Sequence, residues 1–134
     1  MNSRPDLHLD FSSPERTEDS RQRLREACKR SLYILARSVL GMREAVPHVH
    51  GELCAFLDKT PIPAGDKRDD LLVMMPRGFF KSSFVTVSKT IQNIVRNPAA
   101  CTLIVNEKLE NASNFLKSIK SQFEKNRMLR WLFP

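Results

Sequence analysis

A lysine followed by two serines, residues 81–83, is the part of this sequence with the clearest chemical potential. It comes shortly after an apolar run at 71–75 (Leu-Leu-Val-Met-Met), which ends at Pro76 and Gly78. A loop that leads from a buried strand into a helix presents free backbone N–H groups and the positive end of the helix dipole to a phosphate chain. A lysine there can reach the β- and γ-phosphates, and the next hydroxyl can bind magnesium. This spacing predicts a site for ATP and Mg²⁺, with Ser82 as the metal ligand.

The match to the general phosphate-binding signature, G-x-x-x-x-G-K-[ST], is incomplete. Met75 stands at the first glycine position and Phe80 at the second, so that Gly78, Lys81 and Ser82 carry the pattern. A surface turn with a solvated lysine is the alternative. A strand before the loop and a helix after it form the structural context that favours phosphate binding.

The wider segment has a resemblance to a known family. Residues 75–83 read Met-Pro-Arg-Gly-Phe-Phe-Lys-Ser-Ser, and a helix through Asn97-Pro98 and an apolar run at 101–105 follow. This order resembles the deviant Walker A region of the large terminase subunit of tailed bacteriophages. The family's loop commonly reads Pro-Arg-Gly, two variable positions, Lys and then Ser or Thr, which accommodates Phe80. The resemblance covers about residues 29–134 and corresponds to the start of the family's ATPase domain.

The resemblance implies roles for individual residues. Arg77 would approach the γ-phosphate from within the same subunit, and Arg77 and Lys81 together would carry the catalytic charge. The nucleotide would contact Pro76, Arg77, Gly78, Phe79, Phe80, Lys81, Ser82 and Ser83. The parent protein would be an ATPase that packages double-stranded DNA into a procapsid, with a nuclease domain that this chain does not include. Its partners would be the DNA, the small terminase subunit and the portal, on which it would form a homo-oligomer in the cytoplasm of the bacterial host.

The elements around the loop predict an α/β fold. Amphipathic patterns indicate helices over residues 21–41, 48–57, 84–95 and 109–123, and apolar runs indicate buried strands at 71–75 and 101–105. The first helix is expected to bury Leu24, Ala27, Cys28, Leu32, Leu35 and Val39, and the second Val49, Leu53, Phe56 and Leu57. Strand, helix and strand in this order predict a right-handed parallel crossover. The expected architecture is an incomplete P-loop NTPase sheet of the RecA/ASCE type: strand, loop, helix, strand and helix, preceded by two helices.

The same patterns divide the chain into four parts. We expect a mobile leader at 1–20, a helical lead-in at 21–59, a polar linker at 60–70 and the first part of a P-loop ATPase domain at 71–134. The apolar residues at 128–133 have no clear place in this scheme.

A second apparent ATPase motif is weaker. Residues 103–107 (Leu-Ile-Val-Asn-Glu) resemble a Walker B strand, but Asn106 replaces its aspartate and lacks the charge to act on the metal in the same way. In terminases and helicases this motif also lies on a later strand. Glu107 is therefore interpreted as a helix-start residue. Without a catalytic carboxylate, the chain alone is expected to bind ATP weakly and not to hydrolyse it.

Composition sets wider limits. The formal net charge of +7 favours an anionic partner. The three cysteines lack a C-x-x-C spacing, which indicates reduced, mostly buried thiols rather than a disulfide framework. His48, His50 and Cys54 lack a fourth metal ligand, so we do not expect zinc. No apolar stretch approaches the ~20 residues of a membrane span.

Several alternatives remain open at this point. His50 falls in the region where terminases contact adenine, but it suits a helix start or an interface equally well. The basic residues of the first helix suit a solvated face or a contact with DNA phosphates. The chain as a whole suits a fragment of a helicase-like P-loop ATPase, or a non-enzymatic basic helical module that binds nucleic acid or protein.

Overall fold

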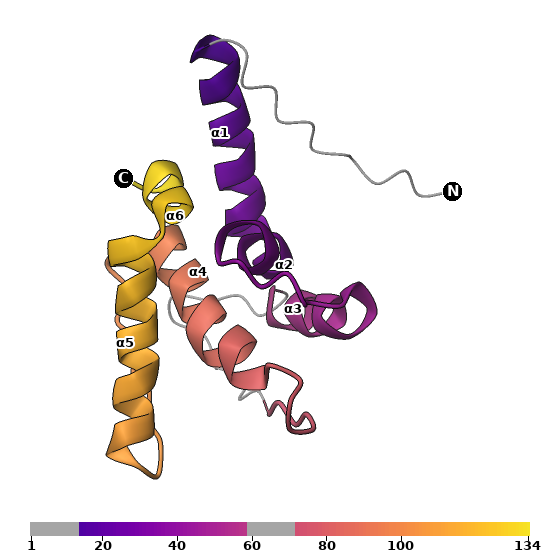
Figure 1. Ribbon diagram of the computed structural model, residues 1–134, viewed down its shortest axis with the longest axis vertical. Helices are drawn as coiled ribbons and strands as arrows, with labels where there is room; N and C mark the ends of the chain where they lie inside the picture. The colour runs from indigo at the N-terminus through magenta and orange to yellow at the C-terminus, as the bar shows by residue number, and fades with distance from the viewer. Residues whose placement is uncertain (1–13, 59–71) are drawn as a thin grey trace, which may run out of the picture.

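A computed structural model describes residues 14–58 and 72–134, and the described chain is built from helices (Figure 1). In chain order they are α1 (Pro14–Arg30), α2 (Leu32–Ile34), η1 (Leu35–Val39), η2 (Pro47–Gly51), α3 (Glu52–Asp58), η3 (Ser83–Ser88), α4 (Lys89–Arg96), α5 (Leu109–Lys125) and α6 (Arg127–Leu132). The three η segments are turns of π-helix. Neither described range contains a β-strand.

The predicted α/β fold is therefore wrong for the part of the chain that the structure describes. Residues 72–75 and 101–105 are irregular chain without strand pairing, and no parallel crossover forms between them. The apolar runs predicted burial on both faces, yet Leu72, Met74, Leu103 and Val105 are each at least 80% exposed. Their neighbours Val73, Met75 and Ile104 pack against the core. A strand needs a neighbouring backbone to complete its hydrogen bonds, and neither run has one among the described residues.

The helix predicted at 21–41 is confirmed in its burial pattern, with Leu24, Cys28, Leu32, Leu35 and Val39 all in the core. It starts earlier than expected, at Pro14, and it is interrupted after Arg30.

The interruption at Ser31 has a local cause. The Ser31 backbone is extended (φ −121°, ψ 115°), and its hydroxyl accepts a hydrogen bond from the N–H of Ile34 at 3.3 Å. Such an N-cap starts a new helix in a new direction. The second part ends just before Gly41, whose φ of +78° is the left-handed conformation that often terminates helices.

The second predicted helix is also confirmed, as η2 followed by α3. Leu53 and Leu57 are buried as expected, but Phe56 is 46% exposed and its predicted burial is wrong. The linker predicted at 60–70 lies outside the described residues, as do Leu71 and most of the predicted leader.

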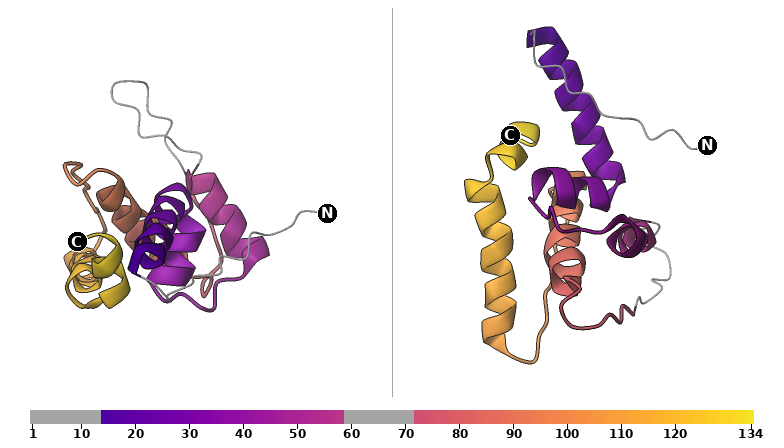
Figure 2. Two further views of the ribbon diagram at one scale, coloured as in Figure 1. Left: turned by 90° about the horizontal axis from the view of Figure 1, so that it is seen from above. Right: turned by 45° about the vertical axis from the view of Figure 1, so that its right-hand side comes forward.

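The helices predicted at 84–95 and 109–123 are confirmed as η3 with α4 and as α5. Residues 81–96 form one continuous helix, which lies between α5 and the α1–α3 group in the views of Figures 1 and 2. Its residues Phe84 and Ile91 are among the largest fully buried side chains of the core. The α5 helix contributes less, because Ile119 is buried whereas Leu116 is 62% exposed.

The unplaced apolar residues at the C-terminal end form α6. Asn126 starts this helix: its side-chain oxygen accepts from the N–H of Leu129 at 3.1 Å, and its amide nitrogen donates to the C=O of Val39 at 2.8 Å. This one side chain therefore caps α6 and ties it to the end of η1.

Basic residues of α1 hold α6 in place. The Arg25 Nε donates to the C=O of Leu132 at 2.7 Å, and the Arg21 guanidinium lies 5.6 Å from the centre of the Trp131 ring. The charged face of α1 is thus not simply solvated, because two of its arginines pack the C-terminal helix against it.

Candidate phosphate-binding loop

The loop before Lys81 leads directly into a helix, as the sequence predicted. The N–H of Phe84 donates to the C=O of Phe80 at 3.0 Å, which closes the first turn. Lys81 and Ser82 are the first two helical residues. The expected order of loop and helix is confirmed, although the strand expected before the loop is absent.

The loop backbone is sharply turned. Gly78 has a φ of +86°, which glycine adopts without steric cost. Phe80 has a φ of +54°, a left-handed conformation that costs a bulky side chain on the order of 1 kcal/mol or more. Such a conformation persists where surrounding contacts impose it. His50 contacts both Phe79 and Phe80 in this turn.

His50 lies beneath the loop and is 3% exposed. Its Nδ1 accepts from the N–H of Val46 at 2.8 Å, and its Nε2 lies 3.2 Å from the C=O of Phe79. The imidazole stacks on the Phe84 ring with centroids 5.0 Å apart and planes at 20°, and it meets the Phe80 ring at 6.0 Å. In the structure His50 contacts both the start of η2 and the loop, which fits a helix-start or interface residue; its contact with adenine stays a prediction.

The charged groups of the loop face outward. Pro76, Arg77, Gly78, Phe79, Phe80, Lys81 and Ser82 are exposed, and Ser83 is half-buried. Neither Arg77 nor Lys81 makes an ion pair or a side-chain hydrogen bond within the described residues. The two cations therefore flank the Gly78 turn beside a helix N-terminus, with no counter-ion among residues 14–58 and 72–134.

A cavity of about 460 Å³ lies next to this helix start. It is lined by Gly41, Met42, Arg43, Glu44, Ala45, Phe80, Ser83 and Phe84. Its volume falls in the range of small-ligand sites, and its walls combine apolar side chains with a few polar groups, as such sites do. The segment after η1 thus forms, with the helix start, a concave surface adjoining the loop.

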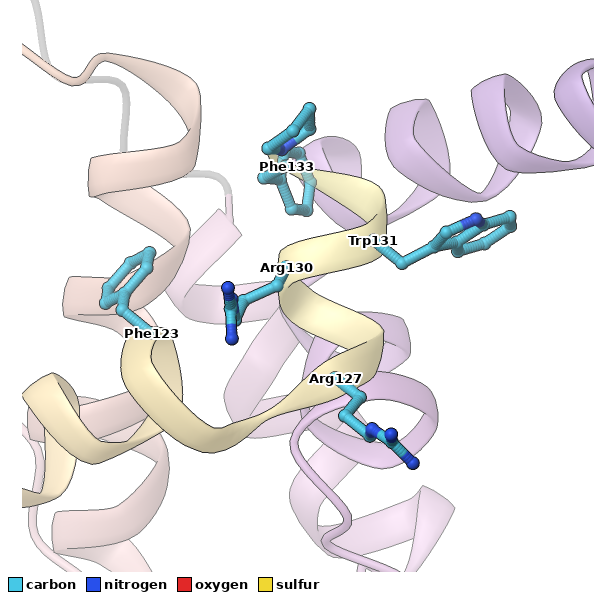
Figure 3. A pocket seen from close by; sticks show the side chains of 6 residues that line it. Phe123, Arg127, Arg130, Trp131 and Phe133 are labelled. Carbon is cyan, nitrogen blue, oxygen red and sulfur yellow. The ribbon is translucent and has the colours of Figure 1, made fainter.

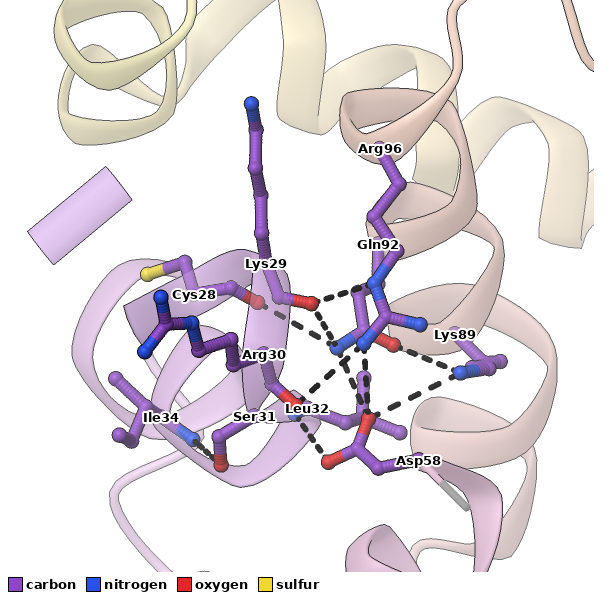
Figure 4. Close-up of polar contacts among 10 residues, drawn as sticks. All are labelled: Cys28, Lys29, Arg30, Ser31, Leu32, Ile34, Asp58, Lys89, Gln92 and Arg96. Atoms are coloured by element: carbon purple, nitrogen blue, oxygen red, sulfur yellow. Dashed lines mark hydrogen bonds and ion pairs between the residues drawn. The ribbon is translucent and has the colours of Figure 1, made fainter. Parts of the chain in front are cut away.

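A partly buried polar cluster, with Gln92 at its fully buried centre, fixes the helix that carries Lys81 (Figure 4). Asp58, at the end of α3, accepts from the N–H of Leu32 at 2.8 Å and from the Gln92 amide at 3.0 Å. It also pairs with Arg96 at 3.5 Å and with Lys89 at 3.9 Å. Figure 4 shows three side chains of α4 and one backbone N–H of the α1–α2 junction meeting at Asp58.

The cluster also completes the end of α1. The fully buried amide of Gln92 lies 3.4 Å from the C=O of both Cys28 and Lys29, and Arg96 Nε donates to the same Lys29 carbonyl. These are carbonyls that a helix C-terminus leaves without intrahelical partners. Sequence analysis missed this cluster because its members are distant in the chain and none belongs to a motif.

Burial changes the proton affinity of groups in and beside the cluster. Burial and the nearby Arg96 charge lower the pKa of Lys89, and they outweigh the opposing attraction of Asp58. Burial, with a smaller contribution from Asp58, raises the pKa of the Cys54 thiol to about 12. Burial alone raises the pKa of Cys28 to about 12. Cys28 and Cys54 are therefore unreactive thiols, whereas Cys101 is exposed.

A second cavity, of about 590 Å³, lies at α6 and is lined by Phe123, Arg127, Arg130, Trp131, Phe133 and Pro134. Figure 3 shows these side chains pointing in different directions around α6 rather than toward one point. Arg21 and Arg25 of α1 already face the rings of Trp131 and Phe133. The loop is therefore the better candidate site.

No group of three or more His, Cys, Asp or Glu side chains gathers within residues 14–58 and 72–134. Magnesium in nucleotide sites takes many of its ligands from phosphates and water, so that the Ser82 hydroxyl at the helix start fits a metal that arrives with the nucleotide. In the same part of the chain, no helix is long and apolar enough to cross a membrane.

Comparisons of this chain with protein-family models, curated proteins and solved structures gave no match.

Proposed function

We propose that residues 76–83 bind the triphosphate of ATP with its Mg²⁺, and that the chain is the N-terminal, nucleotide-binding part of a DNA-packaging motor of the terminase type. One observation carries the proposal: a helix starts at Lys81 directly after a left-handed turn at Gly78, with Arg77 and Lys81 both exposed and without counter-ions among the described residues. Backbone N–H groups, the helix dipole and two cations then act on the same anion.

The motif and the sequence resemblance suggest a role for each group. Lys81 would meet the β- and γ-phosphates, Arg77 the γ-phosphate, and Ser82 the magnesium ion. The cavity beside Phe80 and Ser83 is large enough for the nucleobase. The basic net charge supports double-stranded DNA as the polymer on which the parent motor acts. The small terminase subunit and the portal are proposed as partners of that parent on the sequence resemblance.

The proposal assigns binding to this chain, and not turnover. The residue at the apparent Walker B position, Asn106, has its side-chain oxygen engaged at the start of α5, where it accepts from the N–H of Lys108 at 3.1 Å and from the Asn111 amide at 3.2 Å. This is a local turn contact of the kind that asparagine often makes before a helix. Asn106 thus has a structural role here.

The test is titration of the purified chain with a fluorescent ATP analogue in the presence of Mg²⁺. Lys81→Ala should weaken binding by roughly tenfold or more, because it removes a charge-assisted contact to phosphate. Lys117→Ala, which removes an exposed lysine from the middle of α5, is the matched control and should bind like the wild type. Arg77→Ala should cost the parent's hydrolysis rate far more than its ATP affinity. Equal binding by the Lys81 and Lys117 variants would end the proposal.

One observation favours a second candidate, a basic helical module that binds DNA without nucleotide: the described chain is helical throughout its regular structure. This alternative requires DNA binding in the absence of ATP that Lys81→Ala leaves unchanged. A gel-shift titration with double-stranded DNA, on the same variants with and without ATP, separates the two.

A further inference from the structure

The hydrogen-bond partners of His50 define which of its two ring nitrogens carries the hydrogen. A backbone N–H can only donate, so Nδ1, which faces the N–H of Val46 at 2.8 Å, must present a lone pair. A carbonyl can only accept, so Nε2, which lies 3.2 Å from the Phe79 oxygen, must carry the hydrogen. These contacts therefore assign the lone pair to Nδ1 and the hydrogen to Nε2, and both ring nitrogens have a partner.

Each side of the ring holds a different part of the site. The Nδ1 side is tied to the start of η2 through Val46, and one face stacks on Phe84, which belongs to the same helix as Lys81. The Nε2 side holds the carbonyl of Phe79, two residues before that lysine. The imidazole therefore sets the position of the loop relative to the helix start.

We propose that His50 is a positioning residue of the phosphate loop: by donating from Nε2 to the Phe79 carbonyl, it holds Phe79 and Phe80 in the turn that aims Lys81 at the ligand. This inference rests on the proposed nucleotide site. A loop already held in its binding conformation has less conformational freedom to lose when a ligand arrives. The same contact explains how Phe80 keeps its left-handed backbone.

Two substitutions separate this role from a purely structural one. In His50→Gln, the side-chain amide nitrogen falls near the Nε2 position and can donate to the Phe79 carbonyl, but the contact with the Val46 N–H is lost. In His50→Asn, the side-chain oxygen falls near the Nδ1 position and can accept from Val46, but it cannot reach Phe79. Both variants lose the stacking on Phe84, so they are matched in that respect.

Binding of the fluorescent ATP analogue with Mg²⁺ is the first measurement. Loss of one buried hydrogen bond corresponds to roughly a tenfold change in affinity, so His50→Asn should bind about tenfold more weakly than His50→Gln. A merely structural role as the cap of η2 predicts the reverse order. Equal affinities of the two variants, or the reverse order, would overturn the proposal.

A second measurement does not depend on the nucleotide. Amide hydrogen exchange of Phe84, whose N–H donates to the Phe80 carbonyl at 3.0 Å, should be slow in the wild type, and it should be slower in His50→Gln than in His50→Asn. The ring ¹⁵N shifts of His50 should identify the Nε2–H tautomer. If the wild type fails to bind the ATP analogue, the proposed function fails, and the order of the exchange rates alone tests whether His50 holds the loop. Faster exchange in His50→Asn than in His50→Gln supports this role, and equal or reversed rates overturn it.

Discussion

Replacing Asp58 by alanine should destabilise the protein by about 4 kcal/mol, because its carboxylate accepts three hydrogen bonds and forms an ion pair with Lys89. The Leu32 N–H and the Gln92 amide would each lose a charged acceptor, at 2.8 and 3.0 Å, and Lys89 and Arg96 would lose their counter-ion. Hydrogen bonds to charged groups contribute ~1.5–3 kcal/mol each, and removing one partner of a buried pair costs ~3–5 kcal/mol. These contributions overlap, the two ion pairs are partly exposed and Gln92 keeps two backbone carbonyls nearby, so the expected loss is about 4 kcal/mol rather than their sum.

This loss is measured by urea unfolding, which is monitored by helical circular dichroism and by the fluorescence of the single tryptophan, Trp131. Asp58→Asn is the conservative variant: it keeps an acceptor for Leu32 and should lose less than alanine. Asp19→Ala is the matched control, because Asp19 pairs with Arg23 at 2.7 Å on the exposed surface of α1 and should cost only ~0.5 kcal/mol. A loss in Asp58→Ala no larger than in Asp19→Ala would refute the assignment of Asp58 as the centre of the cluster.

Three further outcomes are expected. Burial raises the pKa of the Cys28 thiol from 9.0 to about 12, so the neutral thiol stabilises the fold fully below pH 9, and this contribution is lost as the pH rises toward 12. Cys28→Ala should therefore reduce the alkaline loss of stability by up to about 4 kcal/mol in urea titrations across this range. Asn126→Ala should cost about 2 kcal/mol, since it removes the cap of α6 and the bond to the Val39 carbonyl, and near-wild-type melting would contradict this. Gly51→Ala, in a helix with open space at its Cβ position, should stabilise by ~0.5–1 kcal/mol, whereas Gly41→Ala, at a φ of +78°, should destabilise by ~1 kcal/mol; thermal melts that show the same sign for both would contradict the reasoning.

The helices were predictable because their apolar residues recur at helical spacing over several turns. Leu24, Cys28 and Leu32 mark one face of such a helix, and all three are in the core. The break after Arg30 was less visible, because a serine within a helical pattern is not by itself a signal for a new N-cap. Periodicity thus predicted where helices form, but not where this one changes direction.

The conformation of the two apolar runs, where strands were predicted, could not be read from the sequence in the same way. A short apolar run has no period that distinguishes a buried strand from irregular chain, and its expected burial depends on elements elsewhere. At residues 72–75 alternate side chains pack on the helices while the others remain in solvent. Local composition showed that these residues are apolar but could not show what covers them.

The candidate site was predictable in part. The order of Gly78, Lys81 and Ser82 predicted a loop followed by a helix, and this order is confirmed. The contact between His50 and Phe79 was not predictable, because it joins residues 29 positions apart and depends on how η2 packs against the continuous helix at 81–96. Contacts of this kind arise from packing, on which a motif carries no information.

The exposed apolar side chains of residues 72–75 and 101–105 have a practical consequence for work in solution. Leu72, Met74, Leu103 and Val105 present large apolar areas to water, next to backbone groups that lack strand partners in the described chain. Segments of this kind are templates for β-pairing between molecules and promote aggregation. The purified chain should therefore self-associate as its concentration rises. Met74→Lys or Val105→Lys should raise its solubility limit without altering the helical core.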